Sequence, residues 1–383
     1  MACATSNLSS YITVLLLFGN VGFLTPTSCH IHGDGNATMF VFGDSFFDPG
    51  NNNYLNVSLS EKANFWPYGE TFFKPASGRF SDGRLIPDFI ALHANLPMWA
   101  PFLQPGGLEF NINGANFASG GSGALRETNP GTLSLEMQLN AFTLIVSSLK
   151  ETVGDAEAEK ILAQAVYLYS TGNNDIGQFL TFHPYNATQL QKQMFTDTVI
   201  GNLTEVLKEV YEIGGSKFAF QTVTPIACLP IVRQDYNLSG NECAEMPHVM
   251  TTLFNTALYE MAEDLETQLP GFKYSIFDFY NQVMDRINYP SKYGFKVVND
   301  ACCGSGVYHG VNCGLGIYEL CNNTSEYLFF DGSHQTEHAY SQLAELWWNG
   351  TSTTTAPYTL KQLFELDSAI EISFNDFGAL SDE

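Results

Sequence analysis

Short apolar runs alternate along this chain with longer segments in which apolar residues recur at helical spacing. The runs predict buried strands at Met39–Phe42, Ala165–Ser170, Lys217–Val223 and Tyr274–Phe277, with a weaker strand near Asn113–Phe117. The longer segments predict helices at Leu133–Leu149, Leu190–Ile213, Pro247–Gln268 and Thr336–Trp348. Strands that alternate with helices in this way are typical of βαβ units and a parallel sheet.

The segment Asn56–Gly107 is rich in Phe, Trp, Pro and Gly, which predicts long loops and short helices around a substrate cleft. The last residues, Leu366–Glu383, carry five acids and no base. Beyond residue 28, the sequence contains no repeat, low-complexity block or Pro/Ser-rich linker. We therefore expect one domain over residues 37–366, followed by an acidic tail over residues 367–383.

Residues 1–28 have the pattern of a secretory signal peptide. The run from Tyr11 to Leu24 is apolar, and Thr25-Pro-Thr-Ser28 offers a cleavage region. The run is short for a membrane span. No Lys or Arg precedes it, so a buried N-terminal helix is the alternative interpretation.

Two further features favour an exported protein. Sequons for N-glycosylation occur at Asn36, Asn56, Asn186, Asn202, Asn237, Asn322, Asn323 and Asn349. Six cysteines lie near the C-terminus, at Cys228, Cys243, Cys302, Cys303, Cys313 and Cys321. An even number in an oxidising compartment predicts up to three bridges, of which Cys228–Cys243 is the local pairing we expect. A structural zinc site is the weaker interpretation, because no pair has Cys-x-x-Cys spacing.

The charge balance excludes some classes of partner. The chain has 40 acidic and 16 basic residues and a net charge of −24. Nucleic acids and anionic membrane surfaces attract clusters of Lys and Arg, and none occurs here. We therefore expect neither nucleic-acid binding nor stable membrane insertion.

Two distant segments carry the elements of a serine nucleophile. Gly43-Asp-Ser45 directly follows the first apolar run, at the strand end where open α/β sheets place their chemistry. A serine needs a base, and Asp331-Gly-Ser-His334 supplies a histidine with an acid that can orient it. These segments predict a serine hydrolase.

Two more segments offer donors for an oxyanion. Phe117-Ala-Ser-Gly-Gly121 follows one predicted strand, and its glycines allow a backbone N–H to approach a substrate closely. Gly172-Asn-Asn174-Asp follows another strand, and an asparagine amide there can donate to the same oxygen. The Gly-x-Ser-x-Gly elbow of α/β-hydrolases is absent, so this is a different serine scaffold.

Together these segments resemble the sequence blocks of the GDSL esterase/lipase family, in the SGNH hydrolase superfamily, and specifically its large plant branch. The resemblance runs from about residue 38 to residue 366. Other motifs of that branch are Asn51-Asn-Asn53, Phe65-Trp-Pro-Tyr-Gly69, Ser77-Gly-Arg-Phe-Ser-Asp-Gly-Arg84, Ser291-Lys-Tyr-Gly-Phe295, Ala301-Cys-Cys-Gly304 and Tyr327-Leu-Phe-Phe-Asp331.

The resemblance implies a three-layer α/β/α sandwich with a five-stranded parallel sheet. It also implies that Ser45, His334 and Asp331 form a catalytic triad. Its oxyanion hole would consist of the Ser45 N–H, the Gly120 N–H and the Asn174 side chain, although Gly121 is adjacent and the register could differ by one. No cofactor is implied.

The expected function is a secreted serine esterase or lipase that hydrolyses carboxylic esters of lipids or small acyl groups. The expected location is the apoplast or cell wall, with the vacuole as an alternative. Transfer of the acyl group to an alcohol of a specialised metabolite is the runner-up, and a binding protein that has lost activity is a third hypothesis. His334-Gln-Thr-Glu-His338 also fits a zinc-peptidase motif, but that interpretation leaves Gly43-Asp-Ser45 unexplained.

Two features of the loop region are interpreted as structural. Arg79, Asp82 and Arg84 predict a network of charges that holds the loops together. The aromatic residues of Asn64–Phe73 are interpreted as core and not as a lipid-binding surface.

Overall fold

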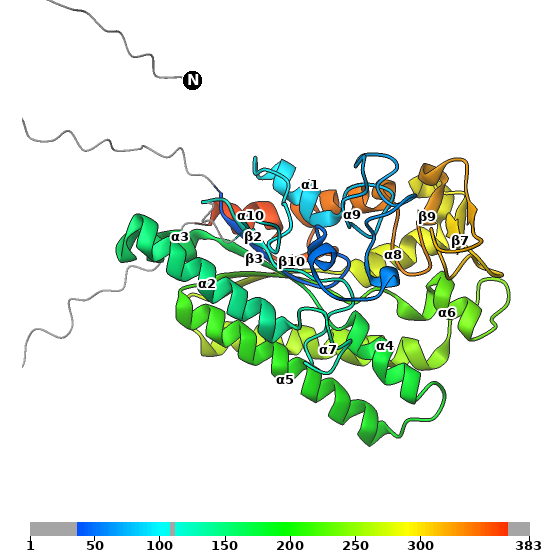
Figure 1. The fold of residues 1–383 in the computed structure, drawn as a ribbon. Coiled ribbons are helices and arrows are strands. Elements are labelled where there is room, and N and C mark those ends of the chain that lie inside the picture. Colours follow the sequence, from blue (N-terminus) through cyan, green and yellow to red (C-terminus); the bar gives the residue numbers. More distant parts are fainter. Residues whose placement is uncertain (1–36, 108–111, 367–383) are drawn as a thin grey trace, which may run out of the picture. The chain divides into compact units, whose positions relative to one another are not determined.

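A computed structural model describes residues 37–107 and 112–366 (Figure 1). The predicted signal peptide, the Asn36 sequon and the acidic tail lie outside the described residues. The limits predicted for the domain therefore stay a prediction. No helix in the described ranges is both long enough and apolar enough to cross a membrane.

The centre of the fold is a six-stranded sheet with the order β10-β5-β4-β3-β1-β2. Its strands are β1 Met39–Gly43, β2 Gly114–Asn116, β3 Val166–Ser170, β4 Lys217–Gln221, β5 Lys273–Phe277 and β10 Thr355–Pro357. The first five pair in parallel, as predicted. The sixth, β10, pairs antiparallel with β5 and was missed. It has three residues and includes a proline, so it carries no recognisable strand pattern.

Helices cover both faces of this sheet, which confirms the predicted α/β/α sandwich (Figure 1). One layer contains α2 Leu135–Val153, α3 Asp155–Gln164, α4 Asn173–Phe182, α5 Gln189–Ile213 and α7 Glu245–Gln268. The other contains α1 Ile86–His93, α8 Phe279–Asn288, α9 Glu337–Asn349 and α10 Leu360–Glu365. A short helix, α6 Pro230–Asp235, follows β4. The four long helices match their predicted positions to within four residues at each end.

Local sequence explains where the long helices begin and end. The side chain of Ser134 accepts a hydrogen bond from Met137 N–H at the start of α2, and Thr188 and Gln191 form a capping box at the start of α5. Gly214 ends α5 with a φ of 127°, a conformation that favours glycine. The helices bury their apolar faces against aromatic residues of the sheet, including Phe40, Phe42, Tyr167 and Tyr169; Phe142 of α2, for example, packs edge to face against Phe40.

Two small sheets extend the C-terminal part of the fold. They pair β6 Val297–Ala301 with β9 Tyr327–Phe329, and β7 Cys303–Gly304 with β8 Glu319–Leu320. The disulfides Cys302–Cys321 and Cys303–Cys313 hold this region, and Cys228–Cys243 forms as predicted. A second apolar cluster contains Cys302, Cys303 and Cys313 together with Tyr68, Phe80 and Phe330.

The prediction that Asn64–Phe73 is core is partly wrong. Tyr68 is buried, but Trp66 and Phe72 are 59% and 43% exposed. Arg84 lies over the Phe72 ring, 4.4 Å from its centroid, so this ring stacks against a charged side chain at the surface. The sequence does not distinguish the buried positions of this segment from the exposed ones, because the segment has neither helical nor strand periodicity.

Candidate active site

The carboxyl ends of β1 and β3 form the topological switch point of the sheet. β1 and β3 are neighbours, and the chain runs from β1 to β2 on one side and from β3 to β4 on the other, so the connections after these two strands leave in opposite directions. Open α/β sheets bind ligands at such a point. Ser45 lies in the turn two residues beyond β1, and α4 begins three residues beyond β3.

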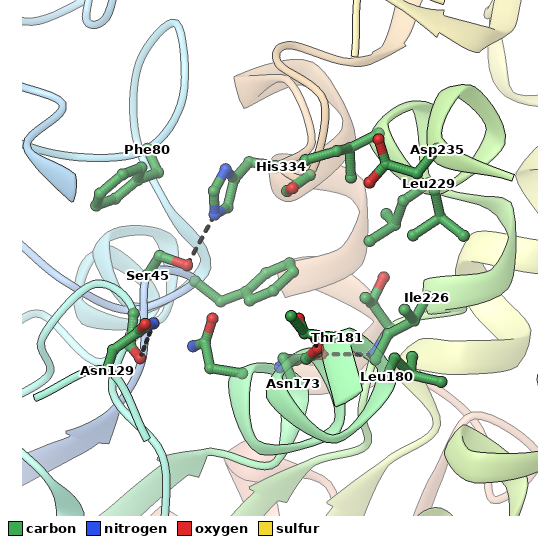
Figure 2. A pocket seen from close by; sticks show the side chains of 18 of the residues that line it. Ser45, Phe80, Asn129, Asn173, Leu180, Thr181, Ile226, Leu229, Asp235 and His334 are labelled. Atoms are coloured by element: carbon green, nitrogen blue, oxygen red, sulfur yellow. Dashed lines mark hydrogen bonds between the residues drawn. The ribbon is translucent and has the colours of Figure 1, made fainter. Parts of the chain in front are cut away.

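Folding brings Ser45, His334 and Asp331 into one hydrogen-bonded line. His334 Nε2 lies 2.7 Å from Ser45 Oγ (Figure 2). On the other side of the imidazole, Nδ1 lies 2.8 Å from Asp331 Oδ1 and 2.9 Å from Oδ2. This arrangement allows the imidazole to take a proton from the serine while the carboxylate fixes the tautomer.

The carboxylate of Asp331 is buried and held by several donors. It accepts hydrogen bonds from the backbone N–H groups of Ser333 and His334, each at 2.8 Å, and from Tyr68 Oη at 2.8 Å. Burial alone would raise the pKa of Asp331, but the His334 imidazole and these donors outweigh it and lower the pKa below its ordinary value. Asp331 therefore stays ionised beside the imidazole.

Two aromatic rings flank the imidazole. The rings of Phe80 and Phe46 lie 5.0 Å and 5.5 Å from that of His334, between centroids. Both phenylalanines are buried. They restrict the orientations of the imidazole and exclude water from it on two sides.

Of the two candidate glycines, Gly121 has the free N–H group. The Gly120 N–H donates to Asp48 Oδ2 at 2.8 Å, so it is already occupied. Gly121 lines the cavity, has a φ of 80°, and its N–H has no acceptor among the described residues. The Ser45 N–H also lacks an acceptor within that part of the chain. The geometry therefore leaves the Gly121 N–H, and not the Gly120 N–H named in the expectation, free to donate, and the identity of the glycine donor stays a prediction.

The Asn174 side chain points toward the same place from the first turn of α4. Its Nδ2 donates one hydrogen to Ser122 O at 2.9 Å, and the second hydrogen is left for another acceptor. Gly172, with a φ of 103°, turns the chain from β3 into α4. The N-terminus of α4 adds partial positive charge near this amide.

Buried carboxylates organise the loops around Ser45. Asp44 accepts from Asn173 Nδ2 at 2.9 Å and from Phe46 N–H at 3.1 Å. Asp48 accepts from the N–H groups of Gly50 and Asn51 as well as Gly120. Burial raises the pKa of Asp44 and of Asp48 to about 6, against the opposing effect of these donors.

The serine opens into a cavity of about 600 Å³. Its polar lining residues include Ser60, Glu61 and Asn129. Its apolar lining residues are Leu180, Pro184, Ile226, Leu229, Ile231 and Val232, and Asn173, Thr181 and Asp235 lie close to some of them. Figure 2 shows Asn129 and the apolar side chains of Leu180, Ile226 and Leu229 on different sides of Ser45.

The geometry disfavours the zinc interpretation of His334-Gln-Thr-Glu-His338. That motif needs both histidines on one helix, but α9 begins only at Glu337, after His334. Glu337 bonds to Arg84 Nε at 2.6 Å, and His338 Nε2 faces Gln342. In the described ranges, no group of three or more metal-ligating side chains is arranged to hold an ion.

The charged loop residues Arg79, Asp82 and Arg84 hold the loops together, as predicted, but each binds a residue outside the set of three. Arg79 makes a two-point contact with Asp88, with Nε–Oδ2 at 2.8 Å and Nη2–Oδ1 at 2.7 Å. Asp82 Oδ1 accepts from Glu337 N–H at 2.7 Å, while Arg84 pairs with the Glu337 carboxylate. These contacts connect the loop before α1 to the start of α9, which follows His334.

Sequence reasoning missed Asp48, Tyr68 and the two flanking phenylalanines. Asp48 carried a usable signal, since an Asp followed by Pro-Gly is typical of a turn in which the carboxylate accepts backbone N–H bonds. Tyr68 carried none, because it meets Asp331 across 263 residues of sequence.

Comparison with known proteins places the chain in a family. The model of the GDSL-like lipase/acylhydrolase family matches residues 39–347. A GDSL lipase of Tanacetum cinerariifolium is 43% identical over 368 residues, which cover 95% of this chain and 96% of the relative. GDSL esterase/lipase 1 of Arabidopsis thaliana is 44% identical, with 86% and 91% covered. An inactive GDSL esterase/lipase-like protein 25 of the same plant is 35% identical, with 88% and 76% covered. The chain belongs to the GDSL-like lipase/acylhydrolase family.

Proposed function

We propose that this protein is a secreted serine esterase or lipase that cleaves carboxylic esters of lipids or small acyl groups through Ser45, His334 and Asp331. Membership of the family makes it an ester hydrolase. The observation that carries the mechanism is the 2.7 Å contact between His334 Nε2 and Ser45 Oγ at the wall of the cavity.

Acylation begins when His334 Nε2 takes the proton of Ser45 as Oγ attacks the ester carbonyl carbon. The charge on the imidazolium is stabilised by Asp331, which stays ionised. The N–H groups of Ser45 and Gly121 and the free amide hydrogen of Asn174 donate to the oxyanion. The tetrahedral intermediate then collapses, the ester C–O bond breaks, and His334 returns the proton to the departing alcohol.

Deacylation repeats these steps with water as the nucleophile. His334 removes a proton from water, the hydroxide adds to the acyl-enzyme, and Ser45 Oγ leaves with that proton. An alcohol that reaches the acyl-enzyme before water gives a new ester by the same route. Acyl transfer therefore uses the same residues, and the supply of acceptor at the cavity decides between the two reactions.

Secretion and glycosylation are part of the proposal. Seven sequon asparagines lie in the described ranges, and all seven are exposed: Asn56, Asn186, Asn202, Asn237, Asn322, Asn323 and Asn349. The three disulfides are consistent with an oxidising compartment such as the extracellular space. The apoplast or cell wall is the proposed location, with the vacuole as the alternative.

The proposal is tested by hydrolysis of p-nitrophenyl esters by the wild type and Ser45→Ala, each with and without a chelator. Ser147→Ala, on the exposed face of α2, is the matched control. We expect activity in the wild type and control, resistance to the chelator, and loss in Ser45→Ala. Activity that survives in Ser45→Ala and is lost with the chelator would instead favour the zinc motif.

The acyl acceptor is determined in the same experiment. Adding candidate alcohols and separating the products shows whether a new ester forms faster than the free acid. An excess of free acid supports the esterase. An excess of ester supports the acyltransferase. A folded wild type that cleaves no ester in any of these assays contradicts both and favours the inert binding protein.

A further inference from the structure

Two cavities share a wall made of two tyrosines. Tyr185 and Tyr236 line the active cavity, as do the apolar residues Leu229 and Val232. The same two tyrosines line a second cavity of about 520 Å³, here called the distal groove. Its other lining residues are Lys192, Leu238, Glu242, Cys243, Ala244, Glu245, Met246 and Val249. Removal of the tyrosine rings would therefore join the two spaces.

The wall is built from two separate segments. Tyr185 lies in the connection between α4 and α5, and Tyr236 directly follows α6. Their rings meet edge to face with centroids 5.3 Å apart, and Tyr236 Oη donates to Pro184 O at 2.8 Å. The disulfide Cys228–Cys243 closes the segment that contains α6 and Tyr236. Tyr236 is thus the anchored member, whereas Tyr185 is 65% exposed.

Both sides of the wall offer apolar side chains to an alkyl chain, beside charged groups: Asp235 in the active cavity and Lys192, Glu242 and Glu245 in the distal groove. On the active side, Leu180, Leu229 and Val232 line the cavity with the tyrosines, and Figure 2 shows Leu180 and Leu229 set apart from Ser45. In the distal groove, Leu238, Met246 and Val249 continue the apolar lining. The polar lining residue Asn129 lies elsewhere in the active cavity (Figure 2). The acyl part of an ester therefore fits the arm beside the wall.

We propose that Tyr185 and Tyr236 set the maximum acyl-chain length of the substrate by closing this arm, and that the distal groove receives longer chains when the rings are removed. The inference rests on the proposed esterase function. It assigns the selectivity among acyl esters to Tyr185 and Tyr236, because the triad itself does not distinguish one acyl chain from another.

The expected effect follows from burial of methylene groups. Each methylene that moves from water into an apolar arm can raise kcat/KM by up to about fourfold. In the wild type, kcat/KM should rise with chain length until the chain meets the tyrosines and should then level off or fall. Opening the wall should extend the rise to longer chains.

The experiment measures kcat/KM for the p-nitrophenyl butyrate, octanoate, dodecanoate and palmitate esters. The readout is the ratio of palmitate to butyrate activity within each protein, so a loss of folded enzyme cancels. Tyr236→Ala and Tyr185→Ala remove one ring each. Tyr236→Phe keeps the ring but loses the hydrogen bond to Pro184 O. Met246→Trp, combined with Tyr236→Ala, refills the distal groove.

We expect the ratio to rise at least tenfold in Tyr236→Ala, to rise in Tyr185→Ala, and to stay near the wild-type value in Tyr236→Phe. Adding Met246→Trp to Tyr236→Ala should return the ratio of palmitate to butyrate activity toward the wild-type value. A ratio that is unchanged in both alanine variants, or a gain that survives Met246→Trp, overturns the inference. Failure of the proposed function is distinguishable, because the wild type would then cleave no ester or Ser45→Ala would remain active.

Discussion

Asn174 offers the most direct test of the proposed oxyanion site, because its donor is a side-chain amide that a substitution can delete without altering the backbone. Its amide is fixed by one hydrogen bond to Ser122 O at 2.9 Å, which leaves the second hydrogen for the substrate. Asn174→Ala removes that hydrogen. It keeps the N–H groups of Ser45 and Gly121.

The expected loss of kcat is the cost of removing one hydrogen-bond donor from the oxyanion. Removing one preorganised donor typically costs about 10²–10³ in kcat, or about 2.7–4 kcal/mol. The ground-state carbonyl oxygen carries little charge, so the loss should fall on kcat, with KM nearly unchanged. The assay is steady-state hydrolysis of a p-nitrophenyl ester, with circular dichroism to verify folding.

A second substitution separates charge from shape. Asn174→Asp keeps the size of the side chain, but an ionised carboxylate cannot donate and repels the oxyanion. We expect kcat for Asn174→Asp to be lower than for Asn174→Ala. A kcat within threefold of the wild type in folded Asn174→Ala, or a loss that lies entirely in KM, refutes the assignment of Asn174 as a donor.

Three further perturbations test the groups around the triad. Tyr68→Phe deletes a hydrogen bond to the ionised, buried Asp331 and should lower the free energy of unfolding by about 1.5–3 kcal/mol, read from urea denaturation; an unchanged midpoint contradicts this. Asp48→Asn turns an amide toward backbone donors and leaves one of them, such as the Gly120 N–H, unsatisfied. Steady-state kinetics should show kcat at least tenfold lower, and wild-type kcat would show that Asp48 does not position this loop. Burial raises the pKa of Asp44 and Asp48 to about 6, above the unfolded value of 3.8. The folded protein therefore binds more protons between these values, so the stability from these groups is present at about pH 4 and lost as the pH rises through about 6. The urea midpoint of the wild type relative to Asp48→Asn should fall over that range, and a constant difference would contradict the shift.

The sequence predicted those parts of the fold that local patterns determine. Five parallel strands and four long helices follow from runs and periodicities that neighbouring residues carry by themselves. Ser45, His334 and Asp331 could be paired from the sequence because each lies next to a strand end or helix start within a recognisable motif. Ser45 lies at the carboxyl edge of the main sheet, and the segment after β9, a strand of a separate small sheet, brings Asp331 and His334 to it.

Other parts could not be predicted, because they depend on contacts between distant segments. Gly120 and Gly121 are equivalent in sequence, and only the position of Asp48 shows which N–H is occupied. Tyr68 reaches Asp331 through the packing of the disulfide-linked cluster. The wall formed with Tyr236 depends on how two loops meet, which no local pattern encodes.

Asp44 and Asp48, the buried acids beside Ser45, have a structural role that cannot be read from the net charge of the chain. Asp44 and Asp48 accept hydrogen bonds from the backbone N–H groups that the loops turn inward. The N–H groups of Ser45 and Gly121 have no acceptor among the described residues, so in the proposed mechanism they are free to donate before the substrate binds. A full charge on either acid would oppose an oxyanion nearby. Because burial raises their pKa, each is partly neutral near pH 6, and the loops keep their acceptors while the repulsion is reduced.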